Sequence, residues 1–299
     1  MSNTSKEYFY SEIFDSVQGE GHYTGVPTAW LRFFLCNLQC NGFGQEDPTN
    51  PDTYILPYEE FDANRIKTVE ELPVWEYGCD SSYSWSKKFK HLQRKGTPAD
   101  IADRVRAEFT NEYNKGKWGN RHMCFTGGEP LMKHAQECVV GIMRHWIDEG
   151  DWPMSVTFET NGTQPLTDDF VNIFEEYIEK CGGELFFSVS PKLWSVAGEK
   201  AKRAIKPETI ADYNKRFFLV KGQLKFVLGP KPEQWDEMEN VLSQIRELGL
   251  DWPVWIMPVG ATVEGQKLVD GDVAKIAYQR GYNVSARVHT YLWGNVVGV

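Results

Sequence analysis

The chain has 299 residues, enough to bury about 75% of its unfolded surface and to build one large domain. It carries 32 Lys and Arg against 42 Asp and Glu, a formal net charge of −10, and no basic run, which argues against nonspecific nucleic-acid binding. Six scattered cysteines, with no signal peptide and no apolar stretch of about 18 residues, predict a cytoplasmic protein without disulfides or a membrane partner.

The first predicted strand leads to a pair of cysteines. Residues 1–10 are polar and aromatic without clear periodicity, and residues 12–17 lead into the glycine-containing turn at 18–21, where backbone amides can approach a ligand closely. The apolar, aromatic run at 29–35 predicts a buried strand that ends at Cys36 and Cys40. Both thiols are therefore expected at the carboxyl end of a strand.

A long segment, residues 41–78, separates Cys40 from a third cysteine, Cys79. Its four prolines and two acidic pairs predict an inserted excursion within the single domain, either functional or mobile.

Regular patterns begin at Thr97, which is expected to cap a helix with Pro98 in its first position. Strand-like and helix-like patterns then alternate, which predicts parallel pairing with right-handed crossovers. The expected strands lie near residues 121–126, 154–158, 185–189, 224–228, 254–257 and 283–288, the last of them reaching His289.

Polar motifs follow four of the expected strands. They are the cysteine pair, the Gly-Gly-Glu-Pro run at 127–130, residues 159–162 and residues 190–192. In a parallel barrel all these strand ends lie on one face, where active sites are found. The recurrence therefore predicts a single site built from strand ends.

Three thiolates can hold a four-iron cluster and leave one iron open for a substrate or cofactor. The spacing of Cys36, Cys40 and Cys79 also allows a zinc site with His22 or His91 as the fourth ligand. The other thiols, Cys124, Cys138 and Cys181, fall within predicted strands or helices and are interpreted as packed side chains.

With the cysteines, the Thr-Gly-Gly-Glu-Pro run at 126–130 resembles the radical S-adenosylmethionine (SAM) enzymes. More narrowly, the chain resembles the 7-carboxy-7-deazaguanine synthase family. The motifs that carry this resemblance lie at residues 16–21, 79–81, 159–163, 188–192 and 289–292.

The resemblance implies an α/β fold, a partial or modified (β/α) radical SAM barrel over residues 1–299, with residues 41–78 inserted between the second and third cluster cysteines. It assigns a [4Fe-4S] cluster to Cys36, Cys40 and Cys79, and Mg²⁺ to Ser81, where the family has Thr. The SAM-binding residues it implies are Gly127, Gly128, Glu129, Glu159, Ser190, Pro191 and Lys192. The substrate-binding residues it implies are Val17, Gln18, Gly19, Arg32 and Thr126.

The implied reaction uses a 5′-deoxyadenosyl radical to convert 6-carboxy-5,6,7,8-tetrahydropterin to 7-carboxy-7-deazaguanine with release of ammonia, in queuosine and 7-deazaguanine (preQ0) biosynthesis. The implied partners are the small pterin substrate, a flavodoxin- or ferredoxin-like reductant and a second copy of the chain in a homodimer.

Several alternatives stay open. The protein could be another radical SAM enzyme such as an activase, or a zinc-stabilised binding module. Phe43 and Tyr77 are both candidates to flank the adenine of SAM, Arg32 could instead form a surface ion pair, and His289 has no assigned role.

Overall fold

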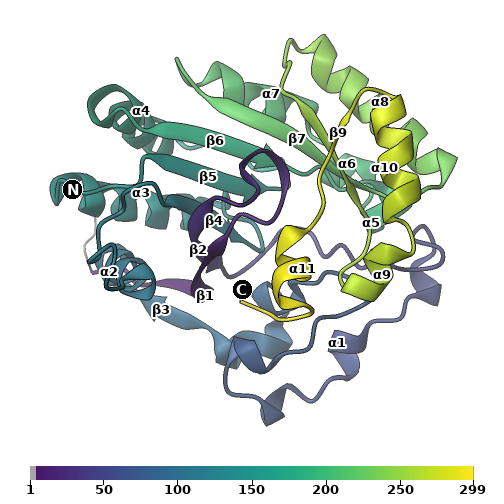
Figure 1. Cartoon of the computed structure of the whole chain (residues 1–299), viewed down its shortest axis with the longest axis horizontal. Helices are drawn as coiled ribbons and strands as arrows, with labels where there is room; N and C mark the ends of the chain where they lie inside the picture. Colours follow the sequence, from purple (N-terminus) through teal and green to yellow (C-terminus); the bar gives the residue numbers. More distant parts are fainter. Residues whose placement is uncertain (1–4, 299) are drawn as a thin grey trace.

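Nine strands within residues 5–298, the residues that this computed structural model describes, form one mixed sheet (Figure 1). The strands are β1 (Tyr8–Val17), β2 (Pro27–Phe33), β3 (Arg94–Gly96), β4 (His122–Gly127), β5 (Ser155–Thr160), β6 (Glu184–Val189), β7 (Lys221–Leu228), β8 (Val254–Pro258) and β9 (Asn283–Val284). Their order is β3-β1-β2-β4-β5-β6-β7-β8-β9. β1 is antiparallel to both of its neighbours, and every pair from β2 to β9 is parallel.

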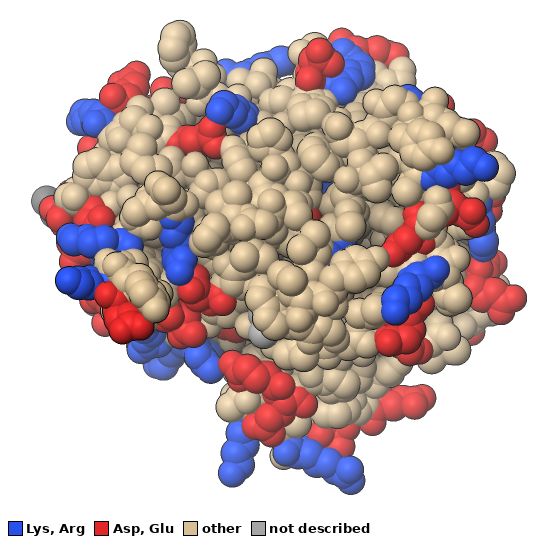
Figure 2. Space-filling model, viewed as in Figure 1, with Lys and Arg blue, Asp and Glu red and all other residues tan. Residues whose placement is uncertain are grey.

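The helices are α1 (Pro57–Glu60), α2 (Pro98–Phe109), α3 (Lys133–Asp148), α4 (Asp168–Cys181), α5 (Trp194–Ala197), α6 (Ala201–Ala204), α7 (Pro207–Lys215), α8 (Pro232–Glu247), α9 (Val263–Lys267), α10 (Asp270–Gln279) and α11 (Val288–Trp293). Among residues 5–298, no helix is both long and apolar enough to span a bilayer. On the face of the molecule in Figure 2, Lys and Arg are interspersed with Asp and Glu and form no continuous basic patch.

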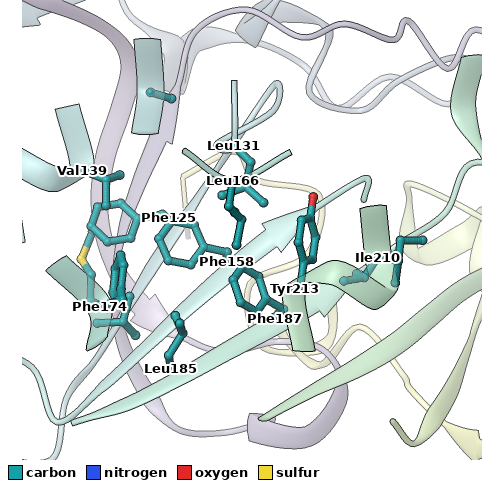
Figure 3. Packing of buried hydrophobic residues seen from close by; sticks show 14 of the residues in the cluster. Phe125, Leu131, Val139, Phe158, Leu166, Phe174, Leu185, Phe187, Ile210 and Tyr213 are labelled. Atoms are coloured by element: carbon teal, nitrogen blue, oxygen red, sulfur yellow. The ribbon is translucent and has the colours of Figure 1, made fainter. Parts of the chain in front are cut away.

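The two faces of the sheet are chemically different because side chains alternate along each strand. Phe125, Phe158 and Phe187, from β4, β5 and β6, point to the face covered by helices, where Phe174 of α4 and Tyr213 of α7 pack against this aromatic row (Figure 3). The residues that follow them, Thr126, Glu159 and Ser188, point to the opposite face. That second face carries polar groups at the strand ends.

The turn between β1 and β2 folds across this second face. Since β1 is antiparallel to β2, the turn begins at the amino end of the parallel strands, and its residues reach β7 and the segment after β9. His22 N donates to Gln223 Oε1 (3.0 Å), and Gly21 N donates to Ser285 Oγ (2.8 Å). Val288 N donates to Gly19 O (2.9 Å). The curled sheet is thus closed at its amino end by this turn, although β1 and β9 are not paired within the described residues.

Residues 41–92, here called the irregular region, lie beside the sheet and below α11 in Figure 1. Apart from α1 they contain only short 3-10 turns and loops. They bury a small core of their own, made of Tyr58, Ala63, Ile66, Val69, Leu72, Trp75, Tyr83, Phe89 and Leu92. The prediction of an excursion in this part of the chain agrees with its lack of regular structure, and whether it is an insertion stays a prediction.

The expected series of alternating strands and helices is confirmed, including the capping box at Thr97 and the left-handed Gly182 that ends α4. One prediction about the end of the chain is wrong, because the last strand stops at Val284, so His289 lies in the first turn of α11 and not at a strand end. β1, which begins at Tyr8, was not predicted as a strand. The short β3 was not predicted.

Candidate active site

A cavity of about 280 Å³ opens at the carboxyl ends of the parallel strands, on the face opposite the helices. Arg32 of β2 pairs in register with Thr126 of β4, and Glu159 of β5 pairs with Ser188 of β6, so that one polar row crosses four strands. Thr126 Oγ1 donates to Glu159 Oε2 (3.2 Å) within this row. The side chains of this row therefore face the cavity because of the register of the strands.

All three predicted cluster cysteines line this cavity. Cys36 and Cys40 follow β2, while Cys79 comes from the irregular region, and the three pack around Leu38 and other small side chains of one hydrophobic cluster. The Cys36 sulfur accepts from Leu38 N (3.4 Å) and from Asn161 Nδ2 (3.9 Å). Two regions far apart in sequence are needed to bring the thiols together.

Burial raises the pKa of the Cys36 thiol to about 12 and that of Cys79 to about 11, and it raises the pKa of Cys40 strongly. In metal-free protein these thiols stay protonated near neutral pH, so metal binding has to displace the protons. All six cysteines are free.

Within residues 5–298, one group of side chains places three potential ligand atoms within 4.8 Å of one another, namely Asp103, His145 and Glu149 on the surface. Cys36, Cys40 and Cys79 do not form such a group, and their binding of a cluster stays a prediction. Neither His22 nor His91 lines the cavity, so the zinc interpretation lacks the fourth ligand it proposed.

The glycine pair at 127–128 packs directly against the chain that leads to Cys36. A Cβ on Gly127 would lie 2.5 Å from the backbone of Phe33, and one on Gly128 would lie 2.1 Å from the carbonyl oxygen of Leu35. Gly127 also has φ +142°, which side chains disfavour. The pair is thus required by the close approach of β4 and the cysteine loop, residues 34–40, a reason that the sequence analysis did not identify.

Most predicted site residues line the cavity: Val17, Gln18, Gly19, Arg32, Ser81, Thr126, Gly127, Gly128, Glu159, Ser190 and Lys192. Glu129 and Pro191 do not. The carboxylate of Glu129 is fully buried and accepts from Leu131 N (3.0 Å), Thr160 Oγ1 (2.7 Å) and Asn161 N (2.8 Å). It joins the loops after β4 and β5. The contact of Glu129 and Pro191 with SAM stays a prediction.

Four charged side chains form a network in the cavity that sequence analysis missed. Glu20, in the turn that closes the amino end, pairs with Lys225 of β7 and with Arg287 Nε (3.1 Å). Arg287 Nη2 also pairs with Asp80 Oδ2 (3.1 Å). Burial acts to raise the pKa of Glu20, but Lys225 and Arg287 hold it well below its usual range. The signal for this network in the sequence was Lys225, the one charged residue of the predicted strand at 224–228.

The guanidinium of Arg32 donates to two side chains. Its Nε donates to Glu12 Oε1 (2.6 Å), which also accepts from the Tyr83 hydroxyl (2.7 Å), and its Nη1 donates to Ser81 Oγ (3.2 Å). Burial acts to lower the pKa of Arg32, but Tyr83 and Glu12 raise it overall. Arg32 is therefore a buried ion-pair partner that faces the cavity, and not the surface ion pair considered as the alternative.

Three residues without a settled role, Phe43, Tyr77 and His289, differ in whether they line the cavity. Phe43 lines the cavity under Lys192, whose Nζ lies 5.7 Å from the ring centroid, whereas Tyr77 does not line it. His289 lines it as well, because Gly19 packs against its imidazole. Trp30 and Trp85 add aromatic walls.

Fold and cavity together define an α/β enzyme with its site at the carboxyl ends of a mostly parallel sheet. No protein-family model matches the sequence. The chain is 26% identical to 7-carboxy-7-deazaguanine synthase of Halobacterium salinarum over 95% of its length and 90% of that protein. It is 25% identical to the protein of the same name from Pyrobaculum aerophilum, with coverage of 96% and 95%.

The protein of that name from Rhodopirellula baltica is 25% identical, with coverage of 95% and 86%. A crystal structure of QueE from Escherichia coli aligns over 95% of both chains with 17% identity and a TM-score of 0.49, a likeness too low to carry an argument. The three relatives, matched over most of their length, all carry the name 7-carboxy-7-deazaguanine synthase, the family that the motifs resemble.

Proposed function

We propose that this protein converts 6-carboxy-5,6,7,8-tetrahydropterin to 7-carboxy-7-deazaguanine by radical SAM chemistry, on the pathway to 7-deazaguanine-modified nucleosides. The observation that carries the proposal is the convergence of Cys36, Cys40 and Cys79 on one cavity that also holds a buried row of hydrogen-bonding groups. Full-length relatives that share one name support it.

The residues fit a [4Fe-4S] cluster and SAM. Cys36, Cys40 and Cys79 would hold the cluster, and Glu159, Ser190 and Lys192 would bind SAM, with Phe43 beside it. When bound, the cluster supplies the electron that cleaves SAM to the 5′-deoxyadenosyl radical. We further propose a flavodoxin- or ferredoxin-like reductant, a homodimer and a cytoplasmic location.

The chain's own residues would hold the pterin in the cavity. The Arg32 guanidinium keeps Nη2 available for a carboxylate, since Nε is committed to Glu12 and Nη1 to Ser81. Gln18 and Glu20, at the closed amino end, present an amide and a carboxylate suited to the donors and acceptors of a pterin ring. The Lys225 and Arg287 side chains keep Glu20 ionised.

Mg²⁺ fits this site only with a rearrangement. Ser81 Oγ and Asp80 are hard oxygen ligands, but Ser81 accepts from Arg32 and Asp80 pairs with Arg287. A cation at Ser81 would have to displace a guanidinium, and a substrate carboxylate that draws Arg32 away would permit this. We therefore expect Mg²⁺ binding to depend on substrate.

The test is anaerobic incubation of reconstituted protein with SAM, dithionite, Mg²⁺ and the carboxypterin, read by mass spectrometry. The expected product is 7-carboxy-7-deazaguanine with SAM recovered. SAM consumed stoichiometrically without this product would favour another radical SAM enzyme, and a colourless protein containing zinc would favour the binding module.

Two variants sharpen the assay. Arg32→Lys should lose turnover but keep uncoupled SAM cleavage, because an ammonium ion does not reproduce the two-pronged guanidinium. Ser81→Ala should lose Mg²⁺ stimulation while Ser81→Thr keeps it. If wild-type turnover is unaffected when divalent ions are chelated, Ser81 is a structural turn residue.

A further inference from the structure

The cysteine loop is held in an unfavourable backbone conformation. Leu35 has φ +85° and Cys40 has φ +55°, and neither is glycine. Each such residue costs about 1–2 kcal/mol relative to a right-handed conformation, so the loop needs contacts that stabilise it.

Leu35 is bound by Ser84 and Glu129, since Leu35 N donates to Ser84 O (2.7 Å) and Glu129 N donates to Leu35 O (2.9 Å). The contacts around Cys40 come from another segment, residues 197–203, which lies between β6 and α7. Glu199 is buried, with 6% of its surface exposed, and its Oε1 accepts from both Gln39 N (2.6 Å) and Cys40 N (2.9 Å). The Arg203 side chain donates to Asn37 O, and Gly42 N donates to Ala197 O (3.0 Å). The segment thus binds the backbone on both sides of Cys40.

The carboxylate of Glu199 also accepts a hydrogen bond from the backbone of a predicted cluster ligand, Cys40. A backbone N–H that donates to Glu199 is not available to donate to a cluster sulfur. Fixed negative charge and the loss of N–H···S bonds both lower the reduction potential of an iron–sulfur cluster. Glu199 therefore has two consequences, one for the shape of the loop and one for its electrostatics.

We propose that Glu199 is a positioning residue that holds Cys40 in its ligating conformation and lowers the reduction potential of the cluster bound there. The proposal rests on the proposed function for its second half only, because the hydrogen bonds exist in the chain without a cluster.

Two variants separate the two effects. Glu199→Gln keeps the acceptor oxygen and removes the charge, and Glu199→Ala removes both. The matched control is Glu237→Gln, because Glu237 of α8 also accepts from two successive amides, Trp194 N and Ser195 N (both 2.8 Å), but does not touch the cysteine loop or the cavity.

The first measurement is amide hydrogen exchange of the metal-free full chain. Glu199→Ala should accelerate exchange at Gln39 and Cys40 by about tenfold, the effect of losing a hydrogen bond to a charged group, whereas Glu237→Gln should not. Unchanged exchange at both amides in Glu199→Ala would overturn the positioning role.

The second measurement is a redox titration of the reconstituted protein followed by electron paramagnetic resonance, with iron counted for each variant. Glu199→Gln should keep the wild-type iron content and shift the midpoint potential to less negative values, while Glu237→Gln leaves the potential unchanged. An unshifted potential in Glu199→Gln would overturn the electrostatic role. If wild-type protein takes up no iron–sulfur cluster, the proposed function fails, and the exchange measurement still decides the positioning role.

Discussion

The sheet with its helices and the irregular region contribute to the same cavity but are stabilised differently. The sheet presents Arg32 and Glu159 from strand positions whose direction follows from register, and it presents Cys36 and Cys40 from the loop after β2, above a large aromatic core. The irregular region presents Cys79, Asp80 and Ser81 from a chain with little regular hydrogen bonding and a nine-residue core. Two of the four predicted metal ligands, Cys79 and Ser81, therefore come from the irregular region.

The largest effect should come from the cysteines themselves. Alanine at Cys36, Cys40 or Cys79 should abolish cluster binding equally, because a methyl group cannot replace a thiolate ligand. Iron and sulfide content after anaerobic reconstitution measures this. Serine at Cys124, Cys138 or Cys181 is the control and should leave the cluster intact. Retention of the cluster in Cys79→Ala alone would separate the irregular region from the metal site.

The next effect compares the two cores. Phe158→Ala, in the row packed by Phe125, Phe174 and Phe187, should lower the free energy of unfolding of the whole chain by about 3–5 kcal/mol. Phe89→Ala, equally buried in the smaller core, should instead open residues 41–92 locally. Denaturant unfolding combined with hydrogen exchange distinguishes them. Faster exchange throughout the sheet in Phe89→Ala would mean that the two cores unfold together.

A smaller effect is expected at one hydrogen bond between the irregular region and β1, from the Tyr83 hydroxyl to Glu12. Tyr83→Phe removes the bond to Glu12 and should cost about 1–3 kcal/mol of stability, with faster exchange in β1. Tyr58→Phe is the control, because the Tyr58 hydroxyl bonds only within the irregular region, to Asn41 and Glu59. Equal exchange in β1 for both variants would show that Tyr83 does not link the regions.

The smallest effect concerns helix and turn caps. Thr97→Ala removes a capping box with bonds of 3.0 and 3.2 Å at the start of α2 and should cost about 1 kcal/mol, while Thr97→Ser retains it. Ser86 caps the turn at residues 87–92 with one bond of 3.4 Å, so Ser86→Ala should cost less. Thermal unfolding of the three variants measures the difference. A greater loss for Ser86→Ala would reverse the ranking of the two regions.

The mistakes in the strand predictions have local physical causes. β1 was not predicted as a strand, and its register shifts between Tyr10 and Glu12, which breaks the alternation of inward and outward residues. The strand after β8 was predicted too long because the bonds to β8 end at Ser285, whose N donates to Ile256 O (2.8 Å). Val288 N instead donates to Gly19 O, and α11 begins at that residue.

The sequence by itself determined the alternating strands and helices, the cap at Thr97 and the strand-end motifs, because these depend on residues a few positions apart. It also pointed to the 7-carboxy-7-deazaguanine synthase family, through short motifs in a fixed order, and relatives of that name match most of the chain. Only the tertiary structure decided the partners of Arg32, the burial of Glu129 away from the cavity and the network of Glu20, Lys225 and Arg287. Each of these requires residues from different elements to meet, and that meeting is set by the curl of the sheet and the turn that crosses it, which no local pattern encodes.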